Sequence, residues 1–377
     1  MTSDYAIQSL SIHHYKSIRR LQRLRLDAVN VLIGANGAGK SNFVSFFTFL
    51  ADVVNQRLQT HIAKRGGAKQ IISSDCRPED CFAAIVTFRA GALVFIAGAT
   101  DDDRLQLLYE KFVPPDTDPH NEFSKMVESY RLHPGEPESK LHNLAAQTGQ
   151  MTLEEELALT AVSLWRVYHF HDAGAAAPVK RFAPLSDNVI LSRNASNLAA
   201  VLYRLRCENP EHYEFIRATV ELAVPYFEDF TLKPRELPGG DEPQISLCWQ
   251  QKGVAMTYGP HQFSDGTLRL ICLATALLQP NPPATMIFDE PELGLHPSAI
   301  ELLASMLLSI SQETQILVST QSPTLLSRFD PEHVLIVEQV EGNSKFRRIE
   351  RAELGTWLEE YSLGQLWEKN IFGGRPR

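Results

Sequence analysis

Short apolar runs alternate with longer helix-like segments over most of the chain. Mainly apolar runs of four or five residues cover 29–33, 284–288 and 316–319, and polar residues or glycine follow each run. Runs of this length bounded by turn residues are typical of parallel strands that are buried on both faces. Longer segments at Phe43 to Leu50 and Leu268 to Leu278 predict helices. This alternation indicates an α/β fold.

Two other stretches predict antiparallel hairpins, and a third predicts an insertion. Residues 81–98, CFAAIVTFRAGALVFIAG, contain two strand-like runs. Residues 333–350, HVLIVEQVEGNSKFRRIE, contain two more on either side of Glu341-Gly342-Asn343. Residues 101–155 are polar, punctuated by proline and only partly helical in pattern. We expect this last segment to be an insertion between core elements.

The composition is that of an ordinary globular protein. The 377 residues are 44% hydrophobic and 21% charged, which suits one large α/β domain with insertions or two to three smaller lobes. No run of about 18 apolar residues occurs, and the first residues lack the apolar region of a signal peptide. We therefore expect a cytoplasmic protein with no membrane partner. The five cysteines are scattered, and we expect reduced thiols.

The charge distribution limits a role for nucleic acid without excluding it. A net charge of −9 argues against a small dedicated DNA-binding module. Two local basic clusters remain, and each is either a solvated face or a strip that contacts the DNA backbone. They consist of Lys16, Arg19, Arg20, Arg23 and Arg25, and of Arg57, Lys64, Arg65 and Lys69.

A phosphate-binding motif follows the first apolar run. Residues 34–41, GANGAGKS, fit G-x-x-x-x-G-K-[ST] at every fixed position, between a predicted strand and a predicted helix. The glycines let the loop curl so that its amides face phosphate groups. Lys40 would neutralise phosphate charge, and Ser41 would ligate Mg²⁺. The predicted nucleotide contacts are Gly34, Ala35, Asn36, Gly37, Ala38, Gly39, Lys40, Ser41 and Asn42.

Acidic and polar residues follow the other two apolar runs. Asp289 and Glu290 stand at a predicted strand end, where α/β sheets place ligands. Asp289 suits the Mg²⁺ shell, and Glu290 suits polarising the attacking water. Gln321 follows the third run, where its side chain could reach a γ-phosphate or that water. The alternative for the acidic pair is a turn at the strand end with no ligand.

A Ser-Asp-Gly turn precedes the long apolar segment that ends before Pro280. Ser264 is a good N-cap for that helix, which would make the turn structural. A helix N-terminus is also a ready anion site. Ser264, Asp265 and Gly266 therefore either only start the helix or also present backbone amides to a phosphate.

In their order along the chain, these motifs and the STQSP strand end resemble those of ABC-type ATPase heads. The chain is most similar to RecF-like predicted ATPases, a group related to RecF, SMC proteins and the overcoming-lysogenization-defect ATPases. Three further stretches fit: IQSLSIHHYKSIRRLQRLRL, WRVYHFHDAG with LSRNASNLAAVLYRLR, and LGQLWEKNIFGGRPR. The resemblance implies an α/β P-loop NTPase with an AAA-type ATPase core, a mixed core sheet, an antiparallel β lobe and an α-helical lobe.

The resemblance also implies a function. Ser264, Asp265 and Gly266 would contact the γ-phosphate held by a partner's loop, so that ATP joins two heads into a homodimer and hydrolysis releases them. The implied activity is Mg²⁺-dependent ATP hydrolysis in DNA repair, recombination or anti-phage defence. The alternative is an ATP-dependent scaffold or sensor that recruits a separately encoded nuclease or toxin effector. DNA and such an effector are therefore candidate partners.

Two departures from the ABC pattern are visible. Gln321 stands where transporters carry a histidine, and an amide can hydrogen-bond but cannot take a positive charge. No clear Q-loop glutamine precedes the helical lobe, and its place is near His169, His171 and Asp172. These three residues suit a metal site, a nucleotide-pocket or water-positioning role, or structural hydrogen bonding. The metal interpretation rests on His169 and His171, which alternate onto one face of a predicted strand, and no third and fourth ligands follow these two at recognisable spacing.

The expected organisation has four parts. Residues 1–100 form the N-terminal β lobe and the phosphate-loop part of the ATPase core, and residues 101–160 form a helical, polar insertion. Residues 161–280 form the helical lobe with the Ser264-Asp265-Gly266 turn, which is called the signature turn. Residues 281–377 complete the ATPase core.

Overall fold

The computed structural model describes residues 5–73, 81–121, 135–141, 152–236, 238 and 241–374. Cys76 and much of the expected insertion, at 122–134 and 142–151, lie outside the described residues. The four described cysteines, Cys81, Cys207, Cys248 and Cys272, are free thiols, as expected.

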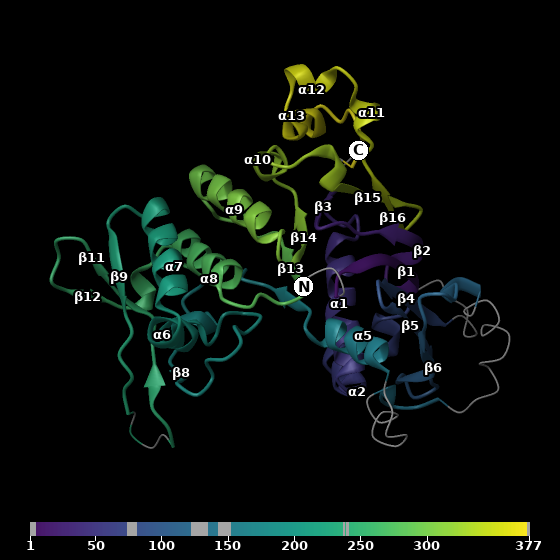
Figure 1. The fold of residues 1–377 in the computed structure, drawn as a ribbon, viewed down its shortest axis with the longest axis horizontal. Helices are drawn as coiled ribbons and strands as arrows, with labels where there is room; N and C mark the ends of the chain where they lie inside the picture. Colours follow the sequence, from purple (N-terminus) through teal and green to yellow (C-terminus); the bar gives the residue numbers. More distant parts are fainter. Residues whose placement is uncertain are drawn as a thin grey trace.

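A six-stranded sheet forms the centre of the molecule (Figure 1). Its strand order is β16-β15-β3-β14-β13-β7, in which neighbouring strands from β15 to β7 are parallel and β16 is antiparallel to β15. The mixed core sheet expected of this α/β fold is thus confirmed. The strands are β3 (Val29–Ile33), β7 (Arg166–Tyr168), β13 (Thr285–Asp289), β14 (Gln315–Thr320), β15 (Val334–Val340) and β16 (Asn343–Arg348).

Alternate side chains of the central strands face two different apolar cores. In β14, Ile316 and Val318 pack into the core shared with α8 (Asp265–Leu278) and α9 (Pro297–Ile310). Leu317 packs into the core that contains α1 (Lys40–Val54) and a second sheet. Because both faces of β14 are covered, its three central residues are all apolar rather than alternating with polar ones.

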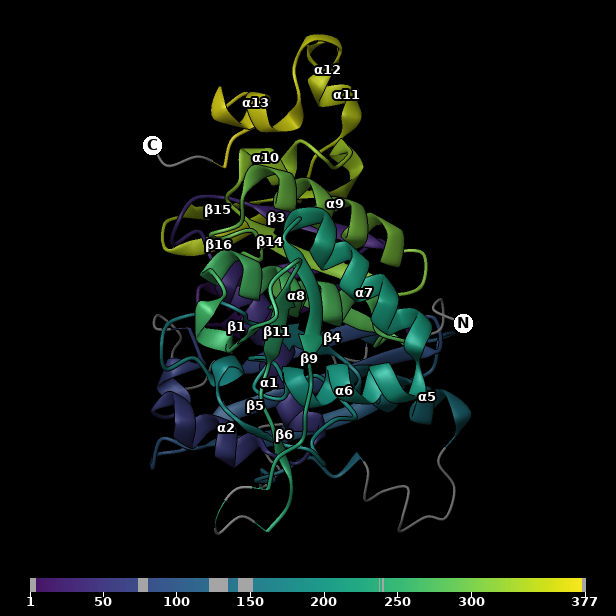
Figure 2. The ribbon, with the colours of Figure 1, turned by 90° about the vertical axis from the view of Figure 1, so that its left-hand side faces the viewer.

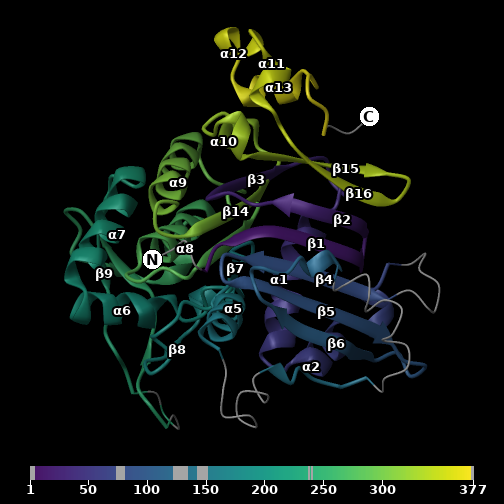
Figure 3. The same ribbon diagram turned by 45° about the vertical axis from the view of Figure 1, so that its right-hand side comes forward.

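The second sheet is antiparallel and has the order β2-β1-β4-β5-β6. It forms a lobe with α2 (Leu58–Arg65) and α5 (Leu153–Ser163) on the side of α1 (Figure 3). The hairpin expected at 81–98 is present as β4 and β5, and β1 and β2 form another hairpin at the N-terminus. The strands are β1 (Ile7–Tyr15), β2 (Ile18–Arg25), β4 (Phe82–Phe88), β5 (Gly91–Ala99) and β6 (Leu105–Val113).

Strand β6 corrects the expectation of a helical, polar insertion at 101–160. Its register places Leu107 opposite Ala97 and Phe112 opposite Leu93, so it extends the sheet as an edge strand. Six of its nine residues, LQLLYEKFV, are apolar, so the strand carries an apolar pattern that the polar and proline-containing residues on either side of it concealed. Helix α5 follows, and a capping box between Thr152 and Glu155 begins it.

The lobe expected to be helical is mixed (Figure 2). Helices α6 (Leu198–Glu208) and α7 (Pro210–Ala223) pack with α8, and two small antiparallel sheets accompany them. Residues 166–168, placed in this lobe by the sequence, instead form the edge strand β7 of the core sheet. The small sheets contain β9 (Phe227–Thr231), β11 (Cys248–Gln251) and β12 (Thr257–Tyr258), and β8 (Ala183–Pro184) and β10 (Gln244–Ile245).

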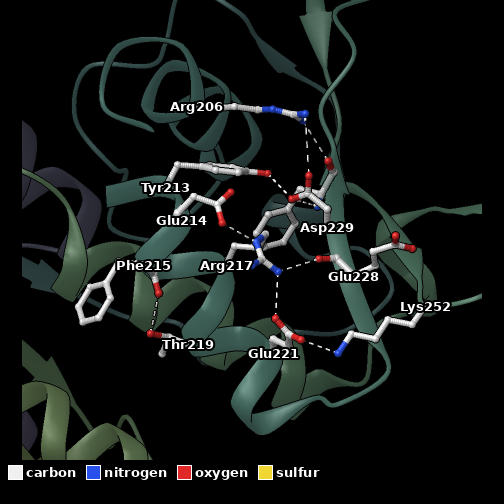
Figure 4. Close-up of polar contacts among 11 residues, drawn as sticks. Arg206, Tyr213, Glu214, Phe215, Arg217, Thr219, Glu221, Glu228, Asp229 and Lys252 are labelled. Carbon is white, nitrogen blue, oxygen red and sulfur yellow. Dashed lines mark hydrogen bonds and ion pairs between the residues drawn. The ribbon is translucent and has the colours of Figure 1, made fainter. Parts of the chain in front are cut away.

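A polar network joins α7 to the small sheet of this lobe (Figure 4). Arg217 donates to Glu214 and Glu221 on its own helix and to the carbonyl of Glu228 in β9. Tyr213 donates to Asp229 at 2.6 Å. The Tyr213 side chain is buried, whereas the ion pairs of Arg217 are accessible to solvent and contribute little to stability. They orient the lobe, whereas its apolar core holds it together.

The C-terminal residues cap one end of the core sheet (Figure 1). Glu341 and Gly342, with φ of 50° and 74°, form the tight turn of the expected β15–β16 hairpin. Four short helices lie near it: α10 (Pro323–Leu326), α11 (Arg351–Leu354), α12 (Trp357–Glu360) and α13 (Leu363–Glu368). Single 3₁₀ turns occur at Ala68–Gln70, Pro178–Lys180, Pro260–Gln262 and Pro331–His333. No helix among the described residues has the length and apolar character needed to cross a bilayer.

Candidate nucleotide-binding site

The loop between β3 and α1 has a backbone that glycine makes accessible. Gly37 and Gly39 have φ of 79° and 110°, a region that other residues adopt only with strain. A Cβ on Gly39 would lie 2.0 Å from the hydroxyl of Ser344. The curled loop leads directly into the N-terminus of α1, where unpaired backbone amides favour an anion.

Lys40 lies inside this loop. Its side chain is buried, and Nζ donates to the carbonyl oxygens of Gly34 at 2.7 Å and Ala35 at 3.1 Å. Burial lowers the pKa of Lys40, and the carboxylates of Glu290 and Asp289 oppose that shift. In the part of the chain that the structure describes, no carboxylate lies within ion-pair distance of Nζ. The positive charge of Lys40 can therefore pair with a phosphate group, and the loop glycines and the N-terminus of α1 also suit phosphate binding.

Two hairpins brace the loop from outside, which the sequence did not reveal. Ser344 in β16 is buried and donates to the carbonyl of Ala38 at 2.7 Å. Its hydroxyl also lies 2.7 Å from that of Ser17, in the turn between β1 and β2. Asn42 donates to Ser17 at 2.7 Å. Asn42 thus contacts the brace rather than standing free at the mouth of the loop.

The structure brings Ser41 and Asp289 together. Asp289 ends β13 directly opposite Ser319 of β14, and both the Ser319 and the Ser41 hydroxyls contact Asp289 Oδ1, the latter at 3.5 Å. A hydroxyl and a carboxylate are oxygen ligands of the kind that Mg²⁺ prefers. This pair of donors fits that ion.

Glu290 and Gln321 also meet. Glu290 has φ of 44°, unusual for a residue with a side chain, and its amide donates to the Ser319 carbonyl at 2.9 Å. Gln321 Nε2 donates to Glu290 Oε1. The turn at Glu290 therefore separates its carboxylate from that of Asp289, and the amide of Gln321 orients it.

Glu292 is a neighbour that sequence reasoning missed. It is 6% exposed, and its Oε1 accepts hydrogen bonds from the Thr320 hydroxyl and, at 3.3 Å, from the backbone N–H of Gln321. Its Oε2 is buried and has no hydrogen-bond partner within the described ranges. Burial raises the pKa of Glu292. The only signal in the sequence was a second acidic residue two positions after Glu290.

The signature turn is exposed and caps α8. Ser264 accepts from the Thr267 amide at 3.1 Å, which confirms the expected N-cap. Asp265 lies 3.4 Å from Lys180, and a Cβ on Gly266 would lie 2.5 Å from the carbonyl of Gly294. None of the hydrogen bonds among described residues joins 264–266 to the phosphate loop. The turn is thus available on the surface.

The segment HFHD, residues 169–172, lies next to a further candidate metal ligand that the sequence did not reveal. Nitrogen atoms of His169 and His171 and a carboxylate oxygen of Asp289 all lie within 4.8 Å of one another. Because β7 and β13 are adjacent parallel strands, residues far apart in the chain end at the same sheet edge. Asp172 does not join them and accepts from the Gly174 amide. Partial desolvation lowers the pKa of His169.

The basic clusters are partly paired. Arg23 binds Asp118 at 3.0 Å, and Arg57 binds Asp52 at 2.7 Å. Burial lowers the pKa of Lys16 to about 8, and its ammonium donates to Ser45 at 2.8 Å. The exposed members are Arg20, Arg23, Arg25, Arg57, Lys64, Arg65 and Lys69. Strand β2 therefore keeps an exposed basic face, and both interpretations of it stay open.

The core sheet, the phosphate loop and the flanking lobes give the fold of an ABC-type P-loop NTPase head. Residues 29–327 match the family described as "AAA domain, putative AbiEii toxin, Type IV TA system". Because this match spans most of the chain, the protein belongs to that family. Among curated proteins, none matches the sequence.

Solved structures of SMC heads share the fold. An SMC head bound to the C-terminal winged-helix domain of ScpA is 14% identical, with a TM-score of 0.58 over 94% of this chain and 99% of that one. An SMC head with an extended coiled coil, bound to the C-terminal domain of ScpA derived from Pyrococcus furiosus, is 14% identical. Its TM-score is 0.51 over 94% of this chain and 98% of that one. A third SMC head, from Pyrococcus yayanosii, is 12% identical, with a TM-score of 0.52 over 94% of this chain and 99% of that one. The expected likeness to RecF/SMC-type heads is confirmed.

Proposed function

We propose that this protein binds and hydrolyses ATP and that ATP joins two copies of it. The observation that carries the proposal is the convergence of Lys40, Asp289 and Glu290 at one sheet edge, while the signature turn stays exposed and unconnected to that edge. The phosphate loop and the two carboxylates lie together without a signature turn facing them, and a second copy of the chain can supply that turn.

Each residue has a distinct proposed role. Lys40 and the loop amides bind the β- and γ-phosphates, and Ser41 with Asp289 holds Mg²⁺, which neutralises developing phosphate charge. Glu290 orients and polarises the attacking water, and Gln321 holds the Glu290 carboxylate in place. Ser264 and the first amides of α8 contact the γ-phosphate bound by the partner. The remaining proposed nucleotide contacts come from residues Gly34 to Asn42 and from Asp265 and Gly266.

A mixing experiment tests the composite site. We expect Lys40→Ala and Ser264→Arg each to lose ATPase activity, because each removes one half of every site in a homodimer. A 1:1 mixture should regain up to about a quarter of the wild-type rate, since half the dimers are mixed and each of these has one intact site. The wild-type rate per subunit should also rise with protein concentration.

Two controls make the mixing result decisive. Ser264→Ala removes the cap, at a stability cost of about 1 kcal/mol, without blocking the surface. It should retain more activity than Ser264→Arg if the turn faces a partner. If both inactive variants are folded and Ser264→Arg binds ATP, yet the mixture stays inactive, the composite site is refuted.

We further propose that the head acts on DNA, in repair or recombination or in anti-phage defence. The exposed basic face of β2 supports this. Arg20→Glu with Arg23→Glu should weaken DNA stimulation of the ATPase and lower the salt dependence of DNA binding by about one unit of slope per lost phosphate contact. The matched control is Lys233→Glu with Arg235→Glu, an equal charge change at exposed positions of the other lobe. Equal effects from both pairs would leave β2 a solvated face.

The second candidate is an ATP-dependent scaffold or sensor with a separately encoded effector. The family description, which names a toxin and a type IV toxin–antitoxin system, favours it. The same measurements separate the two functions. A scaffold should dimerise with ATP and show no DNA stimulation.

A further inference from the structure

The end of β7 and the end of β13 bring together three side chains that the proposed function does not fully use. Tyr168 pairs with Phe288 in register, so the next residues, His169 and Asp289, emerge side by side. His171 is two residues further on, and the His169 and His171 ring centroids are 6.1 Å apart. The nitrogen and oxygen atoms of the three groups all lie within 4.8 Å of one another.

These three groups have donor atoms to spare. Both hydroxyl contacts of Asp289 involve Oδ1, and among the described residues no hydrogen bond reaches Oδ2. Both imidazoles are exposed, and their ring nitrogens have no hydrogen-bond partner in the same part of the chain. Two imidazoles and one carboxylate oxygen therefore converge without being occupied by other protein groups.

The segment that carries the imidazoles is held by its backbone. Arg269 of α8 is buried, and it donates from Nε to the carbonyl of Phe170 at 2.8 Å and from Nη2 to that of His171 at 3.0 Å. The His169 amide donates to the carbonyl of Arg193 at 2.9 Å. Fixing the backbone on both sides of each histidine lowers the entropy cost of gathering the rings around one ion.

We propose that His169, His171 and Asp289 form a site for a divalent transition cation of the Mn²⁺, Co²⁺ or Zn²⁺ class. Imidazole nitrogen suits these ions, whereas Mg²⁺ favours oxygen ligands. The site rests on the proposed function only through Asp289, whose Oδ1 faces Ser41 and whose Oδ2 remains for this cation. It places an imidazole-bound cation next to the phosphate loop.

Manganese alone, without nucleotide, tests the site. Wild-type protein should bind Mn²⁺, seen as loss of the free-ion electron paramagnetic resonance signal, and pulsed spectra should show coupling to imidazole ¹⁴N. The variant His169→Gln with His171→Gln should lose that coupling and at least about tenfold in Mn²⁺ affinity. His333→Gln, a histidine at a distant turn, should match the wild type. Mn²⁺ bound without nitrogen coupling, no Mn²⁺ binding, or an unchanged double variant would overturn the proposal.

Two further measurements separate this inference from the proposed function. Lys40→Ala should lose ATP and keep the nitrogen coupling, because Lys40 is not a ligand of the cation. The double histidine variant should keep Mg²⁺-dependent ATP binding. Nitrogen coupling in a protein that never binds ATP would leave the metal site standing while the nucleotide proposal fails, and the reverse result would do the opposite.

Discussion

The Lys40→Ala variant should lose ATP affinity by about 10- to 150-fold or more. A hydrogen bond to a charged group contributes about 1.5–3 kcal/mol, and the phosphate chain gives Lys40 more than one such contact. Among the residues that the structure describes, the hydrogen-bond partners of the buried ammonium are the carbonyl oxygens of Gly34 and Ala35. Equilibrium binding of a fluorescent ATP analogue, with and without Mg²⁺, measures the loss.

The same substitution also removes two internal hydrogen bonds. Its folded state should be destabilised by about 1–3 kcal/mol, because the carbonyl oxygens lose their donor. Thermal unfolding without nucleotide therefore has to accompany the binding measurement. Lys233→Ala, at an exposed lysine of the other lobe, is the control. A folded Lys40→Ala protein with wild-type affinity would remove the phosphate-loop assignment.

Glu290→Gln should trap a dimer with ATP bound. The amide keeps the shape of the side chain and an oxygen for Gln321 Nε2, but it cannot accept a proton from water. Loss of a positioned general base lowers a rate by about 10²- to 10⁴-fold. Nucleotide binding should persist, since Glu290 is not among the proposed phosphate contacts. Light scattering at saturating ATP gives the mass, and single-turnover hydrolysis gives the rate.

Glu301→Gln provides the matched control. Glu301 is an exposed carboxylate on α9 that pairs with Arg328, and the same change there should alter neither mass nor rate. A Glu290→Gln protein that stays monomeric with ATP bound would count against head-to-head assembly. One that hydrolyses normally would transfer the role of the base to another group.

The sequence predicted the parts of the site that lie at strand ends. Asp289 and Gln321 follow apolar runs that only a strand covered on both faces would need, and parallel strands bring their carboxyl ends to one edge. The order β14–β13–β7 could not be known in advance. For that reason His169 and Asp289 were not paired, although each stood out by itself.

Residues that support others were the hardest to predict. Glu292 and Ser344 have no motif of their own, and their importance comes from what they touch after folding. Strand β6 was missed for a related reason. Its apolar residues lie between the acidic run 101–103 and the prolines at 114–115, and only the pairing with β5 shows that they extend the sheet.

The contact from Ser344 to Ala38 has a consequence for the order of folding during synthesis. The phosphate loop emerges early, between β3 and α1, yet the hydroxyl that donates to its Ala38 carbonyl comes from β16. A nascent chain that ends before residue 344 cannot form this brace, and one that ends before β14 also lacks both strands that flank β3. We therefore expect ribosome-bound fragments ending before Ser344 to bind ATP weakly, so that nucleotide capture begins only after the β15–β16 hairpin has been made.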